Sequence, residues 1–206
     1  FERLVRGVYM KGPSSVSIDK GFIDSWLIDD ATFVFGHFPL PPNVIMNKTL
    51  RENLFAMLTT IRVRIPLIII GKPGTSKTLA ISLLDAECNG TDSRTESMRQ
   101  QPSVHCVAYQ GSKISTSESI LYTFNKAVEL AEALEESQQG THSSSSRKNS
   151  VVNRVVFQFD EIGLAEQSGQ KNALKTLHQM LEQETSGQAG TVGFVGITNY
   201  SLDLAK

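Results

Sequence analysis

One segment constrains the fold of this chain more than any other: a short apolar run leads directly into a glycine-bearing turn that ends in Lys-Thr. Residues 67–70 are Leu-Ile-Ile-Ile, which is typical of a buried strand, and residues 71–78 are Gly-Lys-Pro-Gly-Thr-Ser-Lys-Thr. The backbone N–H groups of such a turn, and the positive end of the next helix, can bind the phosphates of a nucleotide. We therefore predict a phosphate-binding loop followed by a helix over residues 78–87.

Within this loop, the ammonium of Lys77 can reach the β and γ phosphate oxygens, and the hydroxyl of Thr78 can bind Mg²⁺. Ser76 stands where the usual pattern G-x-x-x-x-G-K-[ST] has its second glycine. Serine fits there without strain if its φ is negative, whereas a left-handed conformation would favour glycine. The alternative is a strand-turn-helix connection that uses its glycines and proline only for shape. The predicted nucleotide-binding residues are Gly71, Lys72, Pro73, Gly74, Thr75, Ser76, Lys77, Thr78 and Leu79.

A second apolar run, residues 155–159, ends in two adjacent acids, Asp160 and Glu161. Burial of this strand would deliver both carboxylates to its carboxyl end, where the first can bind Mg²⁺ and the second can activate water as a general base. A strand that ends in solvated acids is common and would be the better explanation by itself. The phosphate-binding loop earlier in the same chain favours the functional interpretation.

A third β-prone run, residues 192–198, is followed by Asn199. An amide in this place can hydrogen-bond the terminal phosphate or the attacking water, whereas the alternative is an asparagine that merely forms a turn. Three strands that end in a loop, an acid pair and an amide, in that order, together predict binding of ATP or ADP with Mg²⁺. The predicted catalytic residues are Lys77, Asp160, Glu161 and Asn199, and the predicted metal ligands are Thr78 and Asp160.

The expected fold is α/β, a three-layer P-loop sandwich with a mostly parallel sheet whose right-handed crossovers bring these motifs to one edge. We assign residues 43–206 to this core and residues 1–42 to an N-terminal extension and linker, in which residues 32–35 are β-prone. Residues 137–150 are polar and serine-rich, which predicts a flexible insertion.

Two helices of the core are expected from their apolar spacing and their capping residues. The first is capped by a Thr49 to Glu52 capping box. The second lies near residues 171–184, with Leu174, Leu177 and Leu181 facing inward. The turn at residues 110–113 is either a plain strand-helix connection or a pore-facing loop of a ring.

The order of these motifs resembles that of AAA+ ATPases. Four segments narrow the resemblance to mysterin-type proteins, giant RING-finger ubiquitin ligases with a dynein-like AAA+ core: the serine-bearing loop and residues 159–166, 174–178 and 196–203. The resemblance covers roughly residues 45–206. It implies an acidic strand and a sensor strand beside the loop strand, neighbouring AAA+ modules as partners, and a helical lid and an arginine finger located beyond Lys206.

Composition narrows the function classes further. Of the 206 residues, 40% are hydrophobic, which is enough for one core. The net charge of −1 does not indicate the basic surface that nucleic acid requires. No apolar run is long enough to span a membrane. The two cysteines, Cys88 and Cys106, lie outside any C-x-x-C pair, so ubiquitin-transfer machinery is expected only in regions outside this chain. Few cysteines and the lack of a recognisable secretory signal favour a cytoplasmic location.

The leading hypothesis is an ATPase module whose nucleotide cycle rearranges its neighbours in a mysterin-like ligase. One alternative is a nucleotide-gated structural module with little turnover. Another is an interaction scaffold with a degenerate phosphate-binding loop, which predicts no saturable binding of Mg-ATP. The intact Lys77-Thr78 pair counts against the last of these.

Overall fold

The computed structural model describes residues 29, 31–139, 152–166, 175–176, 178–181 and 192–199. The chain divides into two compact units, residues 1–38 and 39–206. In the first unit residues 31–35 are helical, so the β-prone reading of residues 32–35 is wrong. The buried residues Ala31, Val34, Phe35 and Phe38 follow the i, i+3, i+4, i+7 spacing of one helix face, which outweighs the β propensity of the individual residues.

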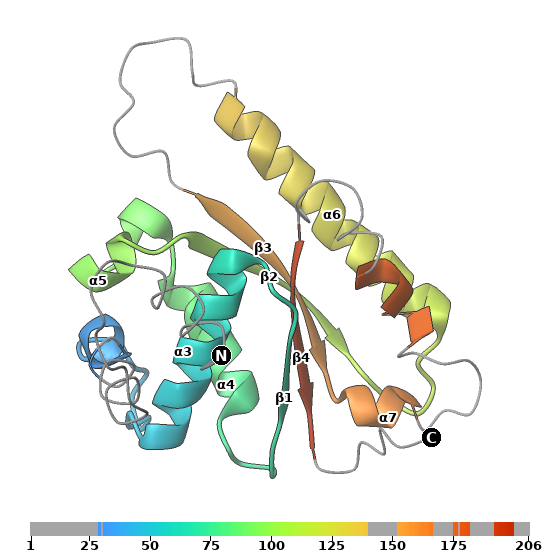
Figure 1. Cartoon of the computed structure of the whole chain (residues 1–206), viewed down its shortest axis with the longest axis horizontal. Coiled ribbons are helices and arrows are strands. Elements are labelled where there is room, and N and C mark those ends of the chain that lie inside the picture. The colour runs from blue at the N-terminus through green and yellow to red at the C-terminus, as the bar shows by residue number, and fades with distance from the viewer. Residues whose placement is uncertain are drawn as a thin grey trace, which may run out of the picture. The chain divides into compact units, whose positions relative to one another are not determined.

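The second unit contains four strands in its described part, all parallel, in the order β1-β4-β3-β2 (Figure 1). Their bounds are β1 Leu67–Ile70, β2 Ser103–Gln110, β3 Asn153–Asp160 and β4 Val192–Thr198. The predicted parallel α/β sheet is therefore confirmed. The expectation that both the acidic strand and the sensor strand flank the loop strand is correct only for β4, because β4 lies between β1 and β3. Every residue of β4 is buried, as an uninterrupted apolar run requires, whereas Ile68 and Ile70 of β1 are 45% and 44% exposed.

Helices cover both faces of this sheet and complete the three layers. Figure 1 shows α3 and α4 on one side of the strands and α6 on the other. The short elements η1 and α5 connect α4 to β2, and α7 follows β3 directly. The bounds are α3 Lys48–Val63, α4 Lys77–Glu87, η1 Gly90–Asp92, α5 Glu96–Arg99, α6 Ser117–Gln139 and α7 Ile162–Glu166.

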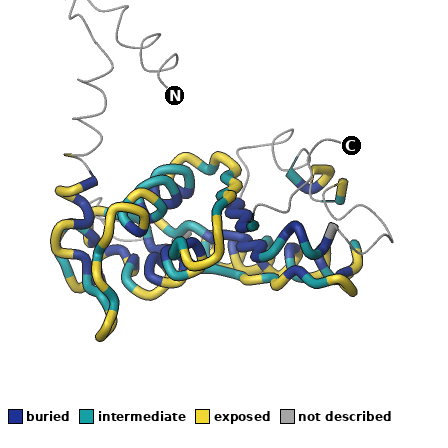
Figure 2. Tube along the Cα trace, turned by 90° about the horizontal axis from the view of Figure 1, so that it is seen from below, coloured by how far each residue is buried: buried dark blue, intermediate teal, exposed yellow. Residues whose placement is uncertain are grey.

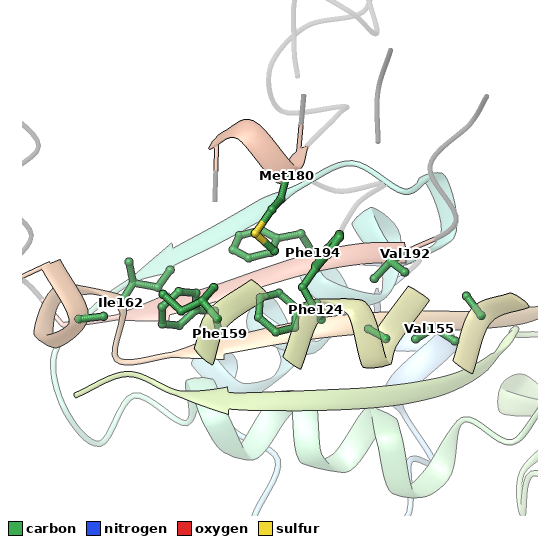
Figure 3. Close-up of a cluster of buried hydrophobic side chains, with 12 residues drawn as sticks. Phe124, Val155, Phe159, Ile162, Met180, Val192 and Phe194 are labelled. Carbon is green, nitrogen blue, oxygen red and sulfur yellow. The ribbon is translucent and has the colours of Figure 1, made fainter. Parts of the chain in front are cut away.

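The core on the α6 side is an aromatic-rich cluster (Figure 3). The rings of Phe124 on α6 and Phe157 on β3 meet edge to face, with centroids 5.5 Å apart and planes at 89°. Phe194 of β4 packs against the same Phe157 ring at 6.2 Å. In Figure 2 the buried residues run through the middle of the trace and the exposed ones line its outer turns. The Phe157 ring of β3 thus joins α6 and β4 in one buried cluster.

The start of α3 differs from the sequence prediction. Asn47, not Thr49, caps the helix, because the Asn47 side chain accepts a hydrogen bond from the Leu50 amide at 2.8 Å. This register buries Leu50, Leu54 and Ile61 along one face of the helix.

Two further predictions fall partly outside the described residues. The structure shows residues 137–139 as the last residues of α6, so the polar insertion does not begin at residue 137, and residues 140–151 lie outside the description. Residues 175–176 and 178–181 are helical and Met180 is buried, whereas Leu174 and Leu177 are not described. Among the helices that are described, none is both long and apolar enough to cross a membrane.

Candidate functional site

The predicted site residues meet at the carboxyl edge of the sheet, around a cavity of about 290 Å³. Parallel strands end at the same edge, which is why β1, β3 and β4 deliver their terminal residues to one place. The lining residues are Pro73, Gly74, Thr75, Ser76, Lys77, Thr78, Leu79, Asp160, Glu161, Ile197 and Asn199. Gly71 and Lys72, which were also predicted, do not line the cavity, and Ile197 was not predicted.

The loop between β1 and α4 is held by its own hydrogen bonds and by α3. The hydroxyl of Thr75 donates to the Lys72 carbonyl at 2.8 Å, and Asn53 of α3 donates its side-chain amide to the Thr75 carbonyl, also at 2.8 Å. Gly74 has φ 78° and Ser76 has φ 58°. Serine therefore occupies the left-handed conformation that favours glycine, and the strain-free alternative considered from the sequence is wrong. The role of Asn53 was not predicted, because a polar residue within a helical pattern does not indicate a hydrogen-bond partner that is distant in sequence.

Lys77 is the first residue of α4 and is only 7% exposed. Its ammonium donates to the carbonyls of Gly71 and Lys72, each at 2.9 Å, and lies 3.3 Å from the Thr75 hydroxyl. It also lies 3.2 Å from the Oδ1 atom of Asn199 at the end of β4. A buried ammonium that faces four oxygen atoms is already solvated by the protein, and the same geometry lets it exchange one of them for an anionic oxygen.

Thr78 and Asp160 form the second contact across the site. The Thr78 hydroxyl donates to Oδ2 of Asp160 at 2.8 Å, which ties the first turn of α4 to the end of β3. Oδ1 of Asp160 accepts the backbone N–H of Glu161 at 2.8 Å, so the carboxylate orientation is fixed at both oxygens. Asp160 is only 8% exposed. A hydroxyl and a carboxylate in contact are oxygen donors of the kind that Mg²⁺ prefers.

Glu161 and Asn199 form the third contact. The side-chain Nδ2 of Asn199 donates to Oε1 of Glu161 at 2.9 Å, while its Oδ1 faces Lys77. The amide therefore connects the acid and the lysine through its two ends. Glu161 itself has φ 52°, a conformation that L-residues rarely adopt and that recurs at functional sites.

Gly111, at the end of β2, is a site residue that the sequence analysis missed. Its N–H donates to the Asp160 carbonyl at 2.8 Å, and a Cβ at this position would lie 2.4 Å from the Glu161 carbonyl oxygen. No other residue type allows this approach, so Gly111 permits the unusual turn at Glu161. A glycine directly after a β-prone run was the available signal, but its partner on β3 could not be known without the pairing of the strands.

The two thiols stay out of this chemistry. Burial, with a smaller contribution from Glu87, raises the pKa of the Cys88 thiol to about 12. Burial first, and then Asp85, raises the pKa of Cys106 well above its ordinary value. Both thiols are therefore protonated at neutral pH, which disfavours a role as nucleophile or metal ligand.

A glycine-bearing loop that ends in Lys-Thr after β1, an acid pair where β3 ends and an amide after β4, at one edge of a parallel sheet, are typical of an AAA-type domain. The family model described as RNF213 AAA domain matches residues 43–206, and the chain belongs to that family.

Individual relatives agree with this assignment. The chain is 37% identical over 188 residues to E3 ubiquitin-protein ligase RNF213 of Mus musculus, an alignment that covers 87% of this chain and 3% of the relative. It is 37% identical over 172 residues to the Homo sapiens protein of that name, covering 82% of this chain and 3% of the relative. For E3 ubiquitin-protein ligase rnf213-beta of Danio rerio the identity is 32% over 210 residues, covering 95% of this chain and 4% of the relative. The chain thus spans only a few per cent of the length of these relatives.

Among solved structures, the one titled "Structure of Drosophila ORC bound to DNA" aligns with 96% of this chain and 50% of its own, at 15% identity and a TM-score of 0.46. The family assignment does not depend on it.

Proposed function

We propose that this chain binds ATP with Mg²⁺ and hydrolyses it, as one AAA-type module of a larger ubiquitin ligase. The observation that carries the proposal is the convergence of three contacts at one cavity: the Lys77 ammonium in its loop, the Thr78–Asp160 pair and the Glu161–Asn199 pair. Each pair joins residues more than thirty positions apart in the sequence, so the arrangement belongs to the fold and not to one local motif.

The phosphates would bind at the loop. Lys77 would donate to the phosphate oxygens, and the backbone N–H groups at the start of α4 would face the same charge with the helix dipole behind them. The cavity of about 290 Å³ is just below the usual size of small-molecule pockets, about 300–1,000 Å³. It therefore suits the phosphate groups rather than the whole nucleotide.

The residues present also fit Mg²⁺. Thr78 and Asp160 would hold the ion, since both are oxygen donors fixed by the surrounding hydrogen bonds. Bound there, Mg²⁺ neutralises phosphate charge. The remaining chemistry belongs to Glu161, whose carboxylate would accept a proton from the attacking water, and to Asn199, which orients that carboxylate through a 2.9 Å hydrogen bond.

We expect saturable binding but slow turnover in the isolated chain. None of the described residues that line the cavity is an arginine. Arginine fingers contribute on the order of 10³–10⁵ to the rate in the P-loop enzymes that use one. A neighbouring module would have to supply this group, which accords with the small share of its relatives that the chain represents. Ubiquitin transfer, the activity in the names of those relatives, we assign to regions outside the chain.

Calorimetric titration with Mg-ATP and Mg-ADP tests the binding step. We expect saturable binding. Lys77→Ala should weaken the Kd about 10-fold to 100-fold, because each charged hydrogen bond contributes roughly 1.5–3 kcal/mol. Glu161→Gln should bind like the wild type and lose turnover, since glutamine keeps an acceptor for Asn199 but cannot take a proton. Lys126→Ala, an exposed lysine on α6, is the matched control and should change neither quantity.

Circular dichroism must first show that each variant is folded. A folded wild type that binds no nucleotide would overturn the proposal. Binding that is intact but never accompanied by turnover, even when adjoining modules of the longer protein are present, would instead identify a nucleotide-gated structural module.

A further inference from the structure

A second and larger cavity lies at the opposite edge of the sheet. It has a volume of about 660 Å³, and its lining includes Pro102 and Val152, the residues directly before β2 and β3. The proposed nucleotide site lies where the strands end, whereas this cavity lies where they begin. Figure 1 shows α5, which contributes to its wall, near the starts of β2 and β3 and away from α7. The two cavities share no lining residue.

The wall of this cavity carries excess positive charge. Three arginines, Arg62, Arg99 and Arg154, face a single carboxylate, Glu96. Glu96 is already 3.3 Å from Arg99, so that ion pair leaves Arg62 and Arg154 without a carboxylate of their own in the cavity wall. Glu135, outside the wall, acts on Arg154. Within the described part of the chain, neither Arg62 nor Arg154 forms an ion pair.

Two buried polar atoms in the wall lack hydrogen-bond partners among the described residues: Nε of Arg154 and Oε1 of Gln101. Arg154 donates through NH1 to the Asn153 carbonyl at 3.2 Å, which leaves its Nε–H as a free donor. Gln101 donates through Nε2 to the Ser97 carbonyl at 3.3 Å, which identifies its Oε1 as a free acceptor. Burial first, and then the neighbouring Arg64, lower the pKa of Arg154, and Glu135 opposes this shift only in part, so the charge of Arg154 remains disfavoured.

We propose that this cavity is a binding site for a small organic phosphate that also carries hydroxyl groups. Arg62 and Arg154 would bind the phosphate oxygens, for which the guanidinium fork is well matched, and the Gln101 oxygen would accept a hydroxyl. The volume of about 660 Å³ lies within the usual range for small-molecule pockets. A free donor and a free acceptor in one wall require a ligand that offers both, which a purely anionic group does not.

Ordered water can satisfy the two buried atoms but brings no negative charge to Arg62 and Arg154. An acidic peptide segment could offset the charge and offer backbone N–H groups to Gln101. The volume of about 660 Å³, which is that of a small-molecule pocket, favours the hydroxylated phosphate over a peptide.

The test is calorimetric titration of the whole chain with inositol trisphosphate, which carries phosphates and hydroxyls, with pyrophosphate and an octaglutamate peptide as comparison probes. We expect saturable binding of inositol trisphosphate, weakened about 10-fold to 100-fold by Arg154→Gln and by Arg62→Gln. Arg62 is exposed on α3, so its replacement leaves the fold intact even if Arg154→Gln does not.

Arg94→Gln is the matched control, because Arg94 is a neighbouring arginine outside the cavity wall whose side chain is 76% exposed. It should bind like the wild type, as should Lys77→Ala, which separates this site from the loop. No binding of inositol trisphosphate, or binding that Arg62→Gln leaves unchanged, would overturn the proposal. Tighter binding of octaglutamate than of the trisphosphate would overturn it as well and identify a peptide surface.

Discussion

Ser76 adopts φ 58° and ψ 25°, and its side chain makes no capping hydrogen bond. An L-residue in this left-handed region costs roughly 1–2 kcal/mol relative to a helical or extended conformation. The residue nevertheless directly precedes Lys77, whose ammonium position depends on the loop conformation. The strain therefore falls on the segment that is proposed to bind phosphate, and glycine would relieve it.

We predict that Ser76→Gly raises the free energy of unfolding by about 0.5–1 kcal/mol, because the relieved strain exceeds the entropy that glycine loses on folding, about 0.5–1 kcal/mol. Urea unfolding followed by circular dichroism measures the change. Ser82→Gly is the matched control: Ser82 lies inside α4, and the same replacement there should lower stability by about 0.5 kcal/mol. Equal changes at both positions would mean that Ser76 is not strained in solution.

Glu161 and Gly111 mark the limit of what residue patterns can predict. The acid pair after an apolar strand was enough to single out Asp160 and Glu161 as candidates. The left-handed backbone of Glu161, and the approach of Gly111 to its carbonyl oxygen, depend on the pairing of β2 with β3. That pairing joins residues about fifty positions apart, so no local spacing reports it.

At the level of elements, strands were easier to predict than their order. The three apolar runs at residues 67–70, 155–159 and 192–198 correspond to β1, β3 and β4, because parallel strands in a covered sheet are largely apolar. Their order was predicted only in part, since β4 separates β1 from β3. The apolar run of β4 predicts that the strand is buried, but a buried strand can occupy any inner position of the sheet.

The first residue of a helix depends on a single capping hydrogen bond. The apolar spacing of α3 did not identify which residue makes that bond. We predict that Asn47→Ala lowers the free energy of unfolding by about 1 kcal/mol, because it removes the acceptor of the Leu50 amide. Thr49→Ala, at the residue that the sequence suggested as the cap, should instead leave stability within about 0.5 kcal/mol of the wild type, since Thr49 is an exposed residue within the helix. Thermal or urea unfolding of both variants decides between the two caps, and a larger loss for Thr49→Ala would contradict the structure.

For the 39–206 unit as a whole, the candidate nucleotide site is a point where separate elements are joined. Asn53 ties α3 to the loop, the Gly71 amide bonds to Thr198 of β4 at 3.2 Å, and Thr78 bonds to Asp160 of β3. A ligand held there contacts the ends of three elements that are distant in sequence. Its binding energy should therefore stabilise the unit globally, and not only the loop.

We accordingly predict that Mg-ATP at about 100 times its Kd raises the free energy of unfolding by about 2.7 kcal/mol. For a chain of this length that corresponds to a rise in Tm of roughly 5–10 °C, measurable by differential scanning calorimetry. At the same nucleotide concentration, Lys77→Ala should reduce the stabilisation to about 0.4–1.4 kcal/mol, because a Kd weakened about 10-fold to 100-fold leaves the site less saturated, whereas Lys126→Ala should keep the full rise. If calorimetric titration detects binding while Tm stays constant, the nucleotide binds a part of the chain that unfolds separately. Binding at the loop would then not stabilise the rest of the 39–206 unit. If the full rise persists in Lys77→Ala, the nucleotide binds elsewhere on the molecule.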